Sequence, residues 1–274
     1  MKTILAAVDF SDISKNSLDY AASLASFAKA KLVLFHSYHI PVSPGEVAMS
    51  VIISAEQLEK NERTELRKLE KKVKNKYSDV ETEVVLRIGF AVDEILAYLT
   101  ERKIDLVVMG VTGSGKSAHV LFGTTSTSLM KKTNTPVLIV PADAKFTKPE
   151  SIVLACDYTA PIPEHIMNNI KSFTSLFGAK LHILDVLRPL EIVSSEKAAE
   201  GIKVENSLNN IQHILHFWEN EDIITGINNF VDSHKTGWLI MIPHTHNAFA
   251  KIFHRSNTKR MAFHTHVPLL SLHE

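Results

Sequence analysis

Apolar residues are grouped in short runs that alternate with stripes of helical spacing. The run at residues 4–8 is apolar at every position and ends at Asp9, a pattern typical of a strand buried on both faces of a parallel sheet. A helical stripe follows, with Asp12 or Ser14 placed to cap the helix. Its members are Leu18, Ala21, Ala22, Ala25 and Ala28. Strand, helix and strand at this spacing predict right-handed crossovers and a parallel sheet.

The second half of the chain repeats this pattern. The apolar run at 152–156 ends at Asp157, and the helix after it is expected to begin at Pro163 and to stop at Gly178. The stripe of this helix consists of Ile166, Ile170, Phe173 and Phe177. Four pairs of segments match in order along the chain: 4–11 with 152–159, 30–36 with 179–185, 105–110 with 238–243, and 135–140 with 267–272. A duplicated domain explains these matches.

The repeat predicts two tandem α/β domains, each with a doubly wound parallel sheet of Rossmann-like type. We place them at residues 1–142, the first repeat, and 149–274, the second repeat, which agrees with the size expected for a chain of 274 residues. Residues 56–76 hold 13 charged side chains in 21 positions, with acid and base mixed, and are typical of an amphipathic helix with a solvated face.

Composition excludes several classes of protein. Lys plus Arg and Asp plus Glu both number 30, so the net charge is zero, which argues against a protein that binds nucleic acid by neutralising phosphates. Cys156 is the only cysteine and cannot form an intramolecular disulfide. Because we find neither a signal-peptide core nor an apolar run long enough to cross a membrane, we expect a cytoplasmic protein with no membrane partner.

The segment 110–126 is rich in glycine and lies between a predicted strand and a short helix that runs to about Lys132. Glycines let the backbone approach a ligand closely, and amides at a helix start favour an anion, so the segment predicts a phosphate site. Two patterns overlap there. Residues 110–117 satisfy GxxxxGK[ST], the P-loop of NTPases, with Lys116 on the phosphates and Ser117 on magnesium. The other pattern is G-2x-G-9x-G-[ST], formed by Gly110, Gly113, Gly123 and Thr124.

With the second pattern the sequence resembles the universal stress protein family, once per half, as in tandem members. The resemblance implies an adenine-nucleotide hydrolase-type fold and, as in the ATP-binding branch, a nucleotide site for ATP, AMP or ADP, with or without Mg²⁺. The matching positions are Ala7, Val8, Asp9, Ser37, Met109, Gly110, Gly113, Gly123, Thr124 and Thr125. Asp9 would hold the ribose, Ala7, Val8 and Ser37 would frame the adenine, Met109 would line the pocket, and the remaining residues would cradle the phosphates.

The second repeat departs from this pattern. Pro243 stands where the first repeat has Gly110, His246 replaces Gly113, and Ser256 replaces Gly123. Proline has no amide hydrogen to offer an anion, so we expect one nucleotide site per chain, in the first repeat. The resemblance further implies that the two repeats pair as an intramolecular pseudo-dimer, or that two chains pair as a homodimer.

Catalysis and metal binding find no clear support in the sequence. No nucleophile triad or carboxylate pair can be assembled, so slow ATP hydrolysis is the most we expect. The H-x-H, H, H-x-H series at His244, His246, His254, His264 and His266 fits no closed metal signature, and we interpret these histidines as solvated. Three hypotheses remain: a stress-response module that binds a nucleotide, a P-loop phosphotransferase, and an interaction protein that needs no nucleotide.

Overall fold

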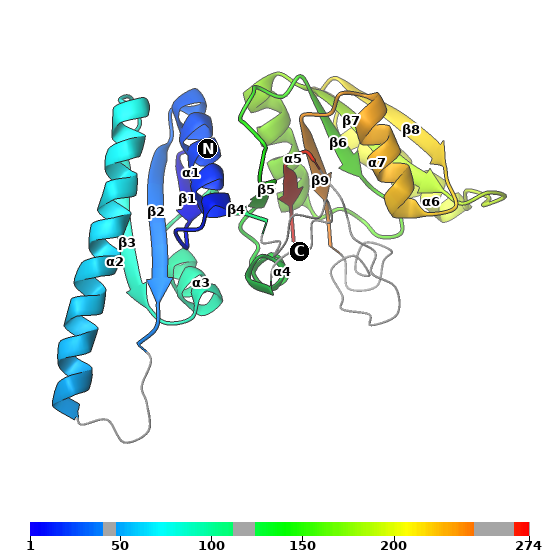
Figure 1. Ribbon diagram of the computed structural model, residues 1–274. Helices are drawn as coiled ribbons and strands as arrows, with labels where there is room; N and C mark the ends of the chain where they lie inside the picture. Colours follow the sequence, from blue (N-terminus) through cyan, green and yellow to red (C-terminus); the bar gives the residue numbers. More distant parts are fainter. Residues whose placement is uncertain (41–47, 112–123, 244–265, 274) are drawn as a thin grey trace. The chain divides into compact units, whose positions relative to one another are not determined.

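The computed structural model describes residues 1–40, 48–111, 124–243 and 266–273. Their contacts divide the chain into two compact units, Met1–Gly110 and Val111–Glu274, which we call the first and second unit. Each unit is an α/β layer structure in which helices pack against strands (Figure 1). Within the described residues, no helix combines the length and the apolar character that crossing a bilayer would require.

Among its described residues, the first unit contains four strands in the order β3-β2-β1-β4, and every pairing among them for which a register is defined is parallel. The strands are β1 (Thr3–Ala7), β2 (Lys31–Tyr38), β3 (Thr82–Ile88) and β4 (Leu106–Gly110). The helices are α1 (Asp12–Ala28), α2 (Ala48–Lys76) and α3 (Ala91–Glu101). The expected parallel crossovers are therefore confirmed. The charged segment at 56–76 is confirmed as part of α2, whose Leu66, Leu69 and Val73 are buried.

In the part of the second unit that the structure describes, six strands follow the order β5-β10-β9-β6-β7-β8 (Figure 1). The strands are β5 (Val137–Val140), β6 (Ser151–Ala155), β7 (Lys180–Leu187), β8 (His213–Glu219), β9 (Trp238–Met241) and β10 (Leu269–Ser271). The helices are α4 (Thr124–Met130), α5 (Glu164–Phe177), α6 (Ser195–Ser207) and α7 (Ile223–Ser233). The pattern β1-α1-β2 is repeated as β6-α5-β7, and in both cases the two strands pair in parallel.

One pairing differs from the expected parallel sheet. Strands β5 and β10, which occupy equivalent places in the two repeats, are antiparallel. Their register is symmetric about the pair Leu138 and Leu270, with Val137 opposite Ser271 and Ile139 opposite Leu269. A two-fold axis perpendicular to two equivalent strands reverses their direction, and an antiparallel pair with this symmetric register is the arrangement that such an axis would produce.

The two predicted helix starts need correction. The N-cap of α1 is Ser11 rather than Asp12 or Ser14, and its side chain accepts a hydrogen bond from the Ser14 amide at 3.2 Å. Pro163 is the N-cap of α5, with extended ψ of 147°, and not its first helical residue. The predicted stop at Gly178 is confirmed, because this glycine has left-handed φ of 60°.

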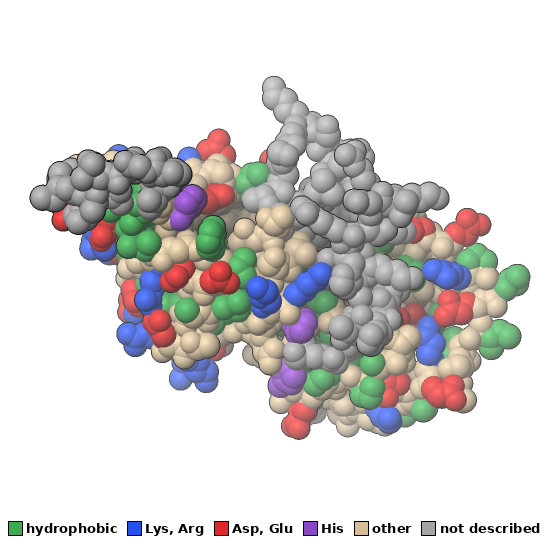
Figure 2. Space-filling model, turned by 90° about the horizontal axis from the view of Figure 1, so that it is seen from below, with side chains coloured by type: hydrophobic (Ala, Val, Ile, Leu, Met, Phe, Trp, Pro, Cys, Tyr) green, Lys and Arg blue, Asp and Glu red, His purple; other side chains and the backbone are tan. Residues whose placement is uncertain are grey.

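Acidic and basic side chains are interspersed on the surface. On the face drawn in Figure 2 the described Lys, Arg, Asp and Glu side chains do not separate into regions of one sign. Such a mixture provides no extended positive surface for a phosphate backbone on this face, in line with the net charge of zero.

Candidate functional site

Several predicted site residues meet at one edge of the sheet in the first unit. Ala6 is paired with Leu34 of β2 on one side and with Val108 of β4 on the other. Because all three strands run in the same direction, the residues that follow these positions lie at the shared carboxyl edge. These residues are Ala7, Val8, Asp9, Ser37, Met109 and Gly110. In a doubly wound sheet, this edge is where ligands bind.

Asp9 forms a tight turn directly after β1. Its Oδ1 accepts hydrogen bonds from the amide of Ser11 at 3.0 Å and from the hydroxyl of Ser11 at 2.6 Å, and Phe10 between them has a positive φ of 62°. Partial burial would raise the pKa of Asp9, but the hydrogen bonds from Ser11 and Ser14 outweigh it and lower the pKa. Asp9 is therefore an exposed, ionised carboxylate, and one of its oxygens is committed to the turn.

Gly110 has a structural reason to be glycine. A Cβ placed on it would lie 2.6 Å from Cγ2 of Ile13 and 3.1 Å from the Ile13 carbonyl oxygen. Helix α1 thus packs against the end of β4 at a distance that a side chain would prevent. This glycine of the signature would be required here even in the absence of a bound phosphate.

The other residues of the predicted phosphate cradle belong to the second compact unit or lie outside the described residues. Gly113 and Gly123 lie outside the described residues, as do Lys116 and Ser117 of the alternative P-loop pattern. Thr124 and Thr125 are the first two residues of α4, in the second compact unit. The phosphate part of the site therefore stays a prediction.

His36 also lies at this edge, although it was not among the predicted site residues. Its Nδ1 lies 2.7 Å from the carbonyl oxygen of Val8, its ring centroid lies 4.4 Å from that of Phe10, and its Nε2 faces Oε2 of Glu62 in α2 at 3.4 Å. The available signal was a polar residue directly after the apolar run at 32–35 of β2.

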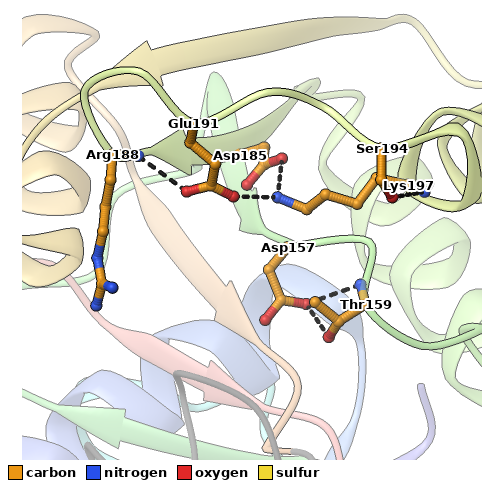
Figure 3. Close-up of polar contacts among 7 residues, drawn as sticks. All are labelled: Asp157, Thr159, Asp185, Arg188, Glu191, Ser194 and Lys197. Atoms are coloured by element: carbon orange, nitrogen blue, oxygen red, sulfur yellow. Dashed lines mark hydrogen bonds and ion pairs between the residues drawn. The ribbon is translucent and has the colours of Figure 1, made fainter.

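The second repeat forms the same turn after β6. Oδ1 of Asp157 accepts hydrogen bonds from the amide of Thr159 at 3.2 Å and from its hydroxyl at 2.8 Å, and Tyr158 has a positive φ of 51° (Figure 3). The amide of Cys156 donates to the Leu184 carbonyl at 2.9 Å, just as the Val8 amide donates to the Phe35 carbonyl at 2.9 Å. The carboxylate turn is thus part of the duplicated frame.

Next to this turn lies a buried ion pair. Nζ of Lys197, in α6, is 3.1 Å from Oδ2 of Asp185 on β7 and 3.2 Å from Oε1 of Glu191 (Figure 3). The Asp185 side chain is only 2% exposed, and burial raises the pKa of its carboxyl group while the Lys197 ammonium opposes that rise. Two contacts fix the surrounding loop. The hydroxyl oxygen of Ser194 caps α6 by accepting a hydrogen bond from the Lys197 amide at 3.2 Å. The Arg188 amide donates a hydrogen bond to Oε2 of Glu191 at 3.1 Å.

A histidine cluster lies in the second unit, where strands β7 and β8 meet helix α7. Nδ1 of His182 on β7 lies 2.9 Å from Nε2 of His216 on β8, and the rings of both approach that of His234 to 5.4 Å. Burial, and then the two neighbouring imidazoles, lower the pKa of His182 to about 4. The ring of Phe230 from α7 packs within this cluster, 4.7 Å from His216.

The histidines of the predicted solvated series lie mostly outside the described residues, with His244, His246, His254 and His264 among those not described. His266 is exposed and its Nε2 lies 3.2 Å from Asp232. In the part of the chain that the structure describes, no group of three or more His, Cys, Asp or Glu side chains is arranged to hold a metal ion.

Comparison with known proteins gives consistent matches. The model of the universal stress protein family matches residues 1–141. Universal stress protein MJ0577 of Methanocaldococcus jannaschii is 23% identical over 51% of this chain and 94% of its own length, and universal stress protein YxiE of Bacillus subtilis is 28% identical over 50% and 97%. A universal stress protein of Archaeoglobus fulgidus DSM 4304 shares the fold over 99% of this chain and 98% of its own, with a TM-score of 0.72 at 15% identity.

Proposed function

The chain belongs to the universal stress protein family, and from this premise we propose that its first repeat binds one adenine nucleotide per chain. The ligand class is ATP, ADP or AMP, as the resemblance of the signature loop implies. The protein would act as a binding module in a stress response rather than as an efficient enzyme. Its catalytic activity would not exceed slow hydrolysis of ATP.

One observation carries this proposal: the ends of the parallel strands β1 and β4 bring Val8, Asp9 and Gly110 to one edge of the first unit. The ionised Asp9 has a second carboxylate oxygen with which to accept hydrogen bonds from ribose hydroxyls. The backbone of Ala7, Val8 and Ser37 would frame the adenine. Charge-assisted hydrogen bonds contribute roughly 1.5–3 kcal/mol each, so a few of them suffice for micromolar affinity.

The phosphates would be held by the loop that begins at Gly110. Amides of Gly113 and Gly123, and the start of α4 at Thr124 and Thr125, would donate hydrogen bonds to phosphate oxygens, and Mg²⁺ would share their charge. A P-loop reading of the same segment is less well supported. A P-loop NTPase also needs a Walker B strand that ends in an acidic residue, and the candidate is β6, which is followed by Asp157. However, β6 is the repeat of β1, and Asp157 is engaged in a turn with Thr159.

The second repeat would serve as a structural partner without a nucleotide of its own. Pro243 stands at the place of Gly110, so an amide donor is missing there. We propose that the symmetric register of β5 and β10 reflects pairing of the two repeats as a pseudo-dimer.

Titration calorimetry of ATP against the purified chain tests the site. We expect binding by the wild type and its loss in the double variant Gly113→Val, Gly123→Val. The control is Gly201→Ala in α6, where an added Cβ would lie no closer than 3.8 Å to another residue. Unchanged affinity in the double variant would refute the site, and no binding by the wild type would favour an interaction protein that needs no nucleotide.

A turnover assay separates the P-loop alternative. A true P-loop enzyme loses ATP hydrolysis on substitution of Lys116→Ala and tolerates Asp9→Ala. For the proposed site we expect the reverse result. Asp9→Ala lowers ATP hydrolysis because Asp9 would contact the ligand, and Lys116→Ala is tolerated because hydrolysis would not depend on Lys116.

A further inference from the structure

Strand β8 forms the outer edge of the sheet in the second unit. Among the described residues it pairs with β7 on one side and is the last strand of the sheet on the other (Figure 1). The Gln212 carbonyl accepts a hydrogen bond from the Leu181 amide, and the Asn220 amide donates one to the Leu187 carbonyl, both at 2.9 Å. Successive residues of a strand direct their backbone groups to opposite sides. The residues whose N–H and C=O groups point away from β7 are therefore His213, Leu215, Phe217 and Glu219.

The side chains of this edge are mostly apolar. Ile214 is 39% exposed and Phe217 is 57% exposed, and Leu215 and Trp218 beside them are partly exposed. Residues 213–218 include no Lys, Arg, Asp or Glu. A strand edge with free backbone groups and exposed apolar side chains is a template for pairing with another strand.

The equivalent edge strand of the first repeat, β3, carries charges at two of these positions. The register of β3 with β2 matches that of β8 with β7, so Glu83 corresponds to Ile214. In the same alignment Arg87 corresponds to Trp218. Glu83 and Arg87 each form an ion pair with a neighbouring side chain. Charged side chains on an edge strand oppose its pairing with another chain, and the second repeat has apolar residues in their place.

The sequence of β8 is complementary to itself when two copies run antiparallel about His216. A two-fold axis at this residue places Leu215 opposite Phe217 of a second copy. Both residues direct their backbone groups outward, so each such pair exchanges two hydrogen bonds. On the other face, Ile214 lies opposite Trp218 of the second copy, which joins the two positions that are charged in β3. This register pairs every residue of β8, and any shift of it shortens the pairing.

We propose that β8 is an interaction surface for a second copy of this chain: two β8 strands pair antiparallel about His216 and join two second units through one sheet. The sheet contains a precedent within the chain, because β5 and β10 are antiparallel with a register symmetric about Leu138 and Leu270. The proposal is independent of the nucleotide site, since β8 lies in the repeat for which no nucleotide is proposed.

Sedimentation velocity of the full chain, at about 1 to 100 μM, measures this association. We expect a reversible dimer with a micromolar dissociation constant, because a pairing one strand long makes a small interface. Ile214→Glu restores the acid that β3 has at this place, and Phe217→Lys adds a charge beside the outward backbone groups. Each should weaken the dimer about tenfold, because the two-fold axis repeats the change on both sides. The matched control is Ile88→Lys on β3, 55% exposed, which should associate like the wild type.

A disulfide tests the register of the two strands. Two residues that face each other in a pair without mutual hydrogen bonds have Cα atoms about 4.5 Å apart, within reach of a disulfide. Under oxidising conditions His216→Cys should therefore give a covalent dimer. Glu219→Cys should not, because an axis at His216 holds the two copies of residue 219 about 20 Å apart along the strands. The native Cys156 is buried in both samples.

Urea unfolding shows whether each variant is folded, and the remaining variants decide if one is not. A wild type that stays monomeric at about 100 μM would overturn the proposal and would leave this edge to a strand of a different protein. A dimer that persists unchanged in both Ile214→Glu and Phe217→Lys would also overturn it, because association would then use another surface. Covalent dimers of Glu219→Cys as abundant as those of His216→Cys would overturn the symmetric pairing.

Discussion

The two repeats share one turn and differ in what surrounds it. Asp9 with Ser11 and Asp157 with Thr159 form the same hydrogen bonds, with a positive φ at the residue between them. Around this common turn, the first repeat has Gly110 and the pair of His36 with Glu62, whereas the second has Pro243 and the pair of Asp185 with Lys197.

This difference shows which features report on folding and which report on a ligand. A carboxylate that persists in both repeats, including the one whose glycines are lost, has a role in the turn itself. Asp9 alone is therefore weak support for a nucleotide site. The glycine pattern, which distinguishes the repeats, is more informative. The following changes test the comparison, from the largest expected effect to the smallest.

Removal of the buried cation of the second repeat should have the largest effect. Lys197→Met leaves the Asp185 carboxylate buried without its partner, and the free energy of unfolding of the second repeat should fall by about 3–5 kcal/mol at neutral pH. Acid should reduce this loss, because a protonated Asp185 needs no cation. Urea denaturation measures it, with the exposed Lys203→Met as control. A loss no larger than that of the control would contradict the structure of this pair.

Acid should destabilise the second repeat through its histidine cluster. The pKa of His182 is about 4 in the folded protein, below the ordinary value of 6.5, so protons favour the unfolded chain. Stability is complete above pH 6.5 and declines as the pH falls toward 4, by about 3 kcal/mol. Both tryptophans, Trp218 and Trp238, lie in the second repeat, so their fluorescence follows its unfolding. His182→Leu should remove this acid sensitivity, and an unchanged pH midpoint would refute the interpretation.

Substitution at the end of the fourth strand of each repeat should lower stability appreciably only in the first repeat, where this position is Gly110. Gly110→Ala forces Ile13 of α1 to move and should cost about 2 kcal/mol of stability. Pro243→Ala at the matching place should change stability by less than about 1 kcal/mol. Hydrogen exchange of the β1 and β4 amides reports the first change. Equal effects at both positions would show that the repeats do not differ in how their helices approach this strand.

The two turn carboxylates should be equal in stability and unequal in binding. Asp9→Ala and Asp157→Ala each remove two hydrogen bonds to a serine or threonine and should each cost about 1 kcal/mol. Only Asp9→Ala should weaken ATP binding, by about tenfold. Thermal unfolding and calorimetric titration measure the two effects, and an equal loss of ATP affinity in Asp157→Ala would remove the distinction.

Elements defined by local periodicity could be predicted from the sequence, and features that depend on tertiary pairing could not. The buried strands and the stripe of α5 follow from apolar spacing, and Ile166, Ile170, Phe173 and Phe177 are indeed all buried. The N-cap at Ser11 was missed because it depends on the left-handed conformation of Phe10. The antiparallel β5 and β10 were missed because strand direction is set by how equivalent strands meet.

The candidate site was predicted to a similar extent. Strand ends give Val8, Asp9 and Gly110 a common edge, as the repeat pattern indicates. Glu62, which faces His36, and Lys197, which pairs with Asp185, come from the helix after each strand, and no spacing rule in the sequence connects them. The structural need for Gly110 was also hidden, because it arises from contact with Ile13.

The number of nucleotides bound per chain tests the central claim most directly. Native mass spectrometry of the full chain with saturating ATP should show one bound nucleotide, and none in the double variant Gly113→Val, Gly123→Val. Two nucleotides per chain, or one that persists in the double variant, would contradict the assignment of nucleotide binding to the first repeat alone.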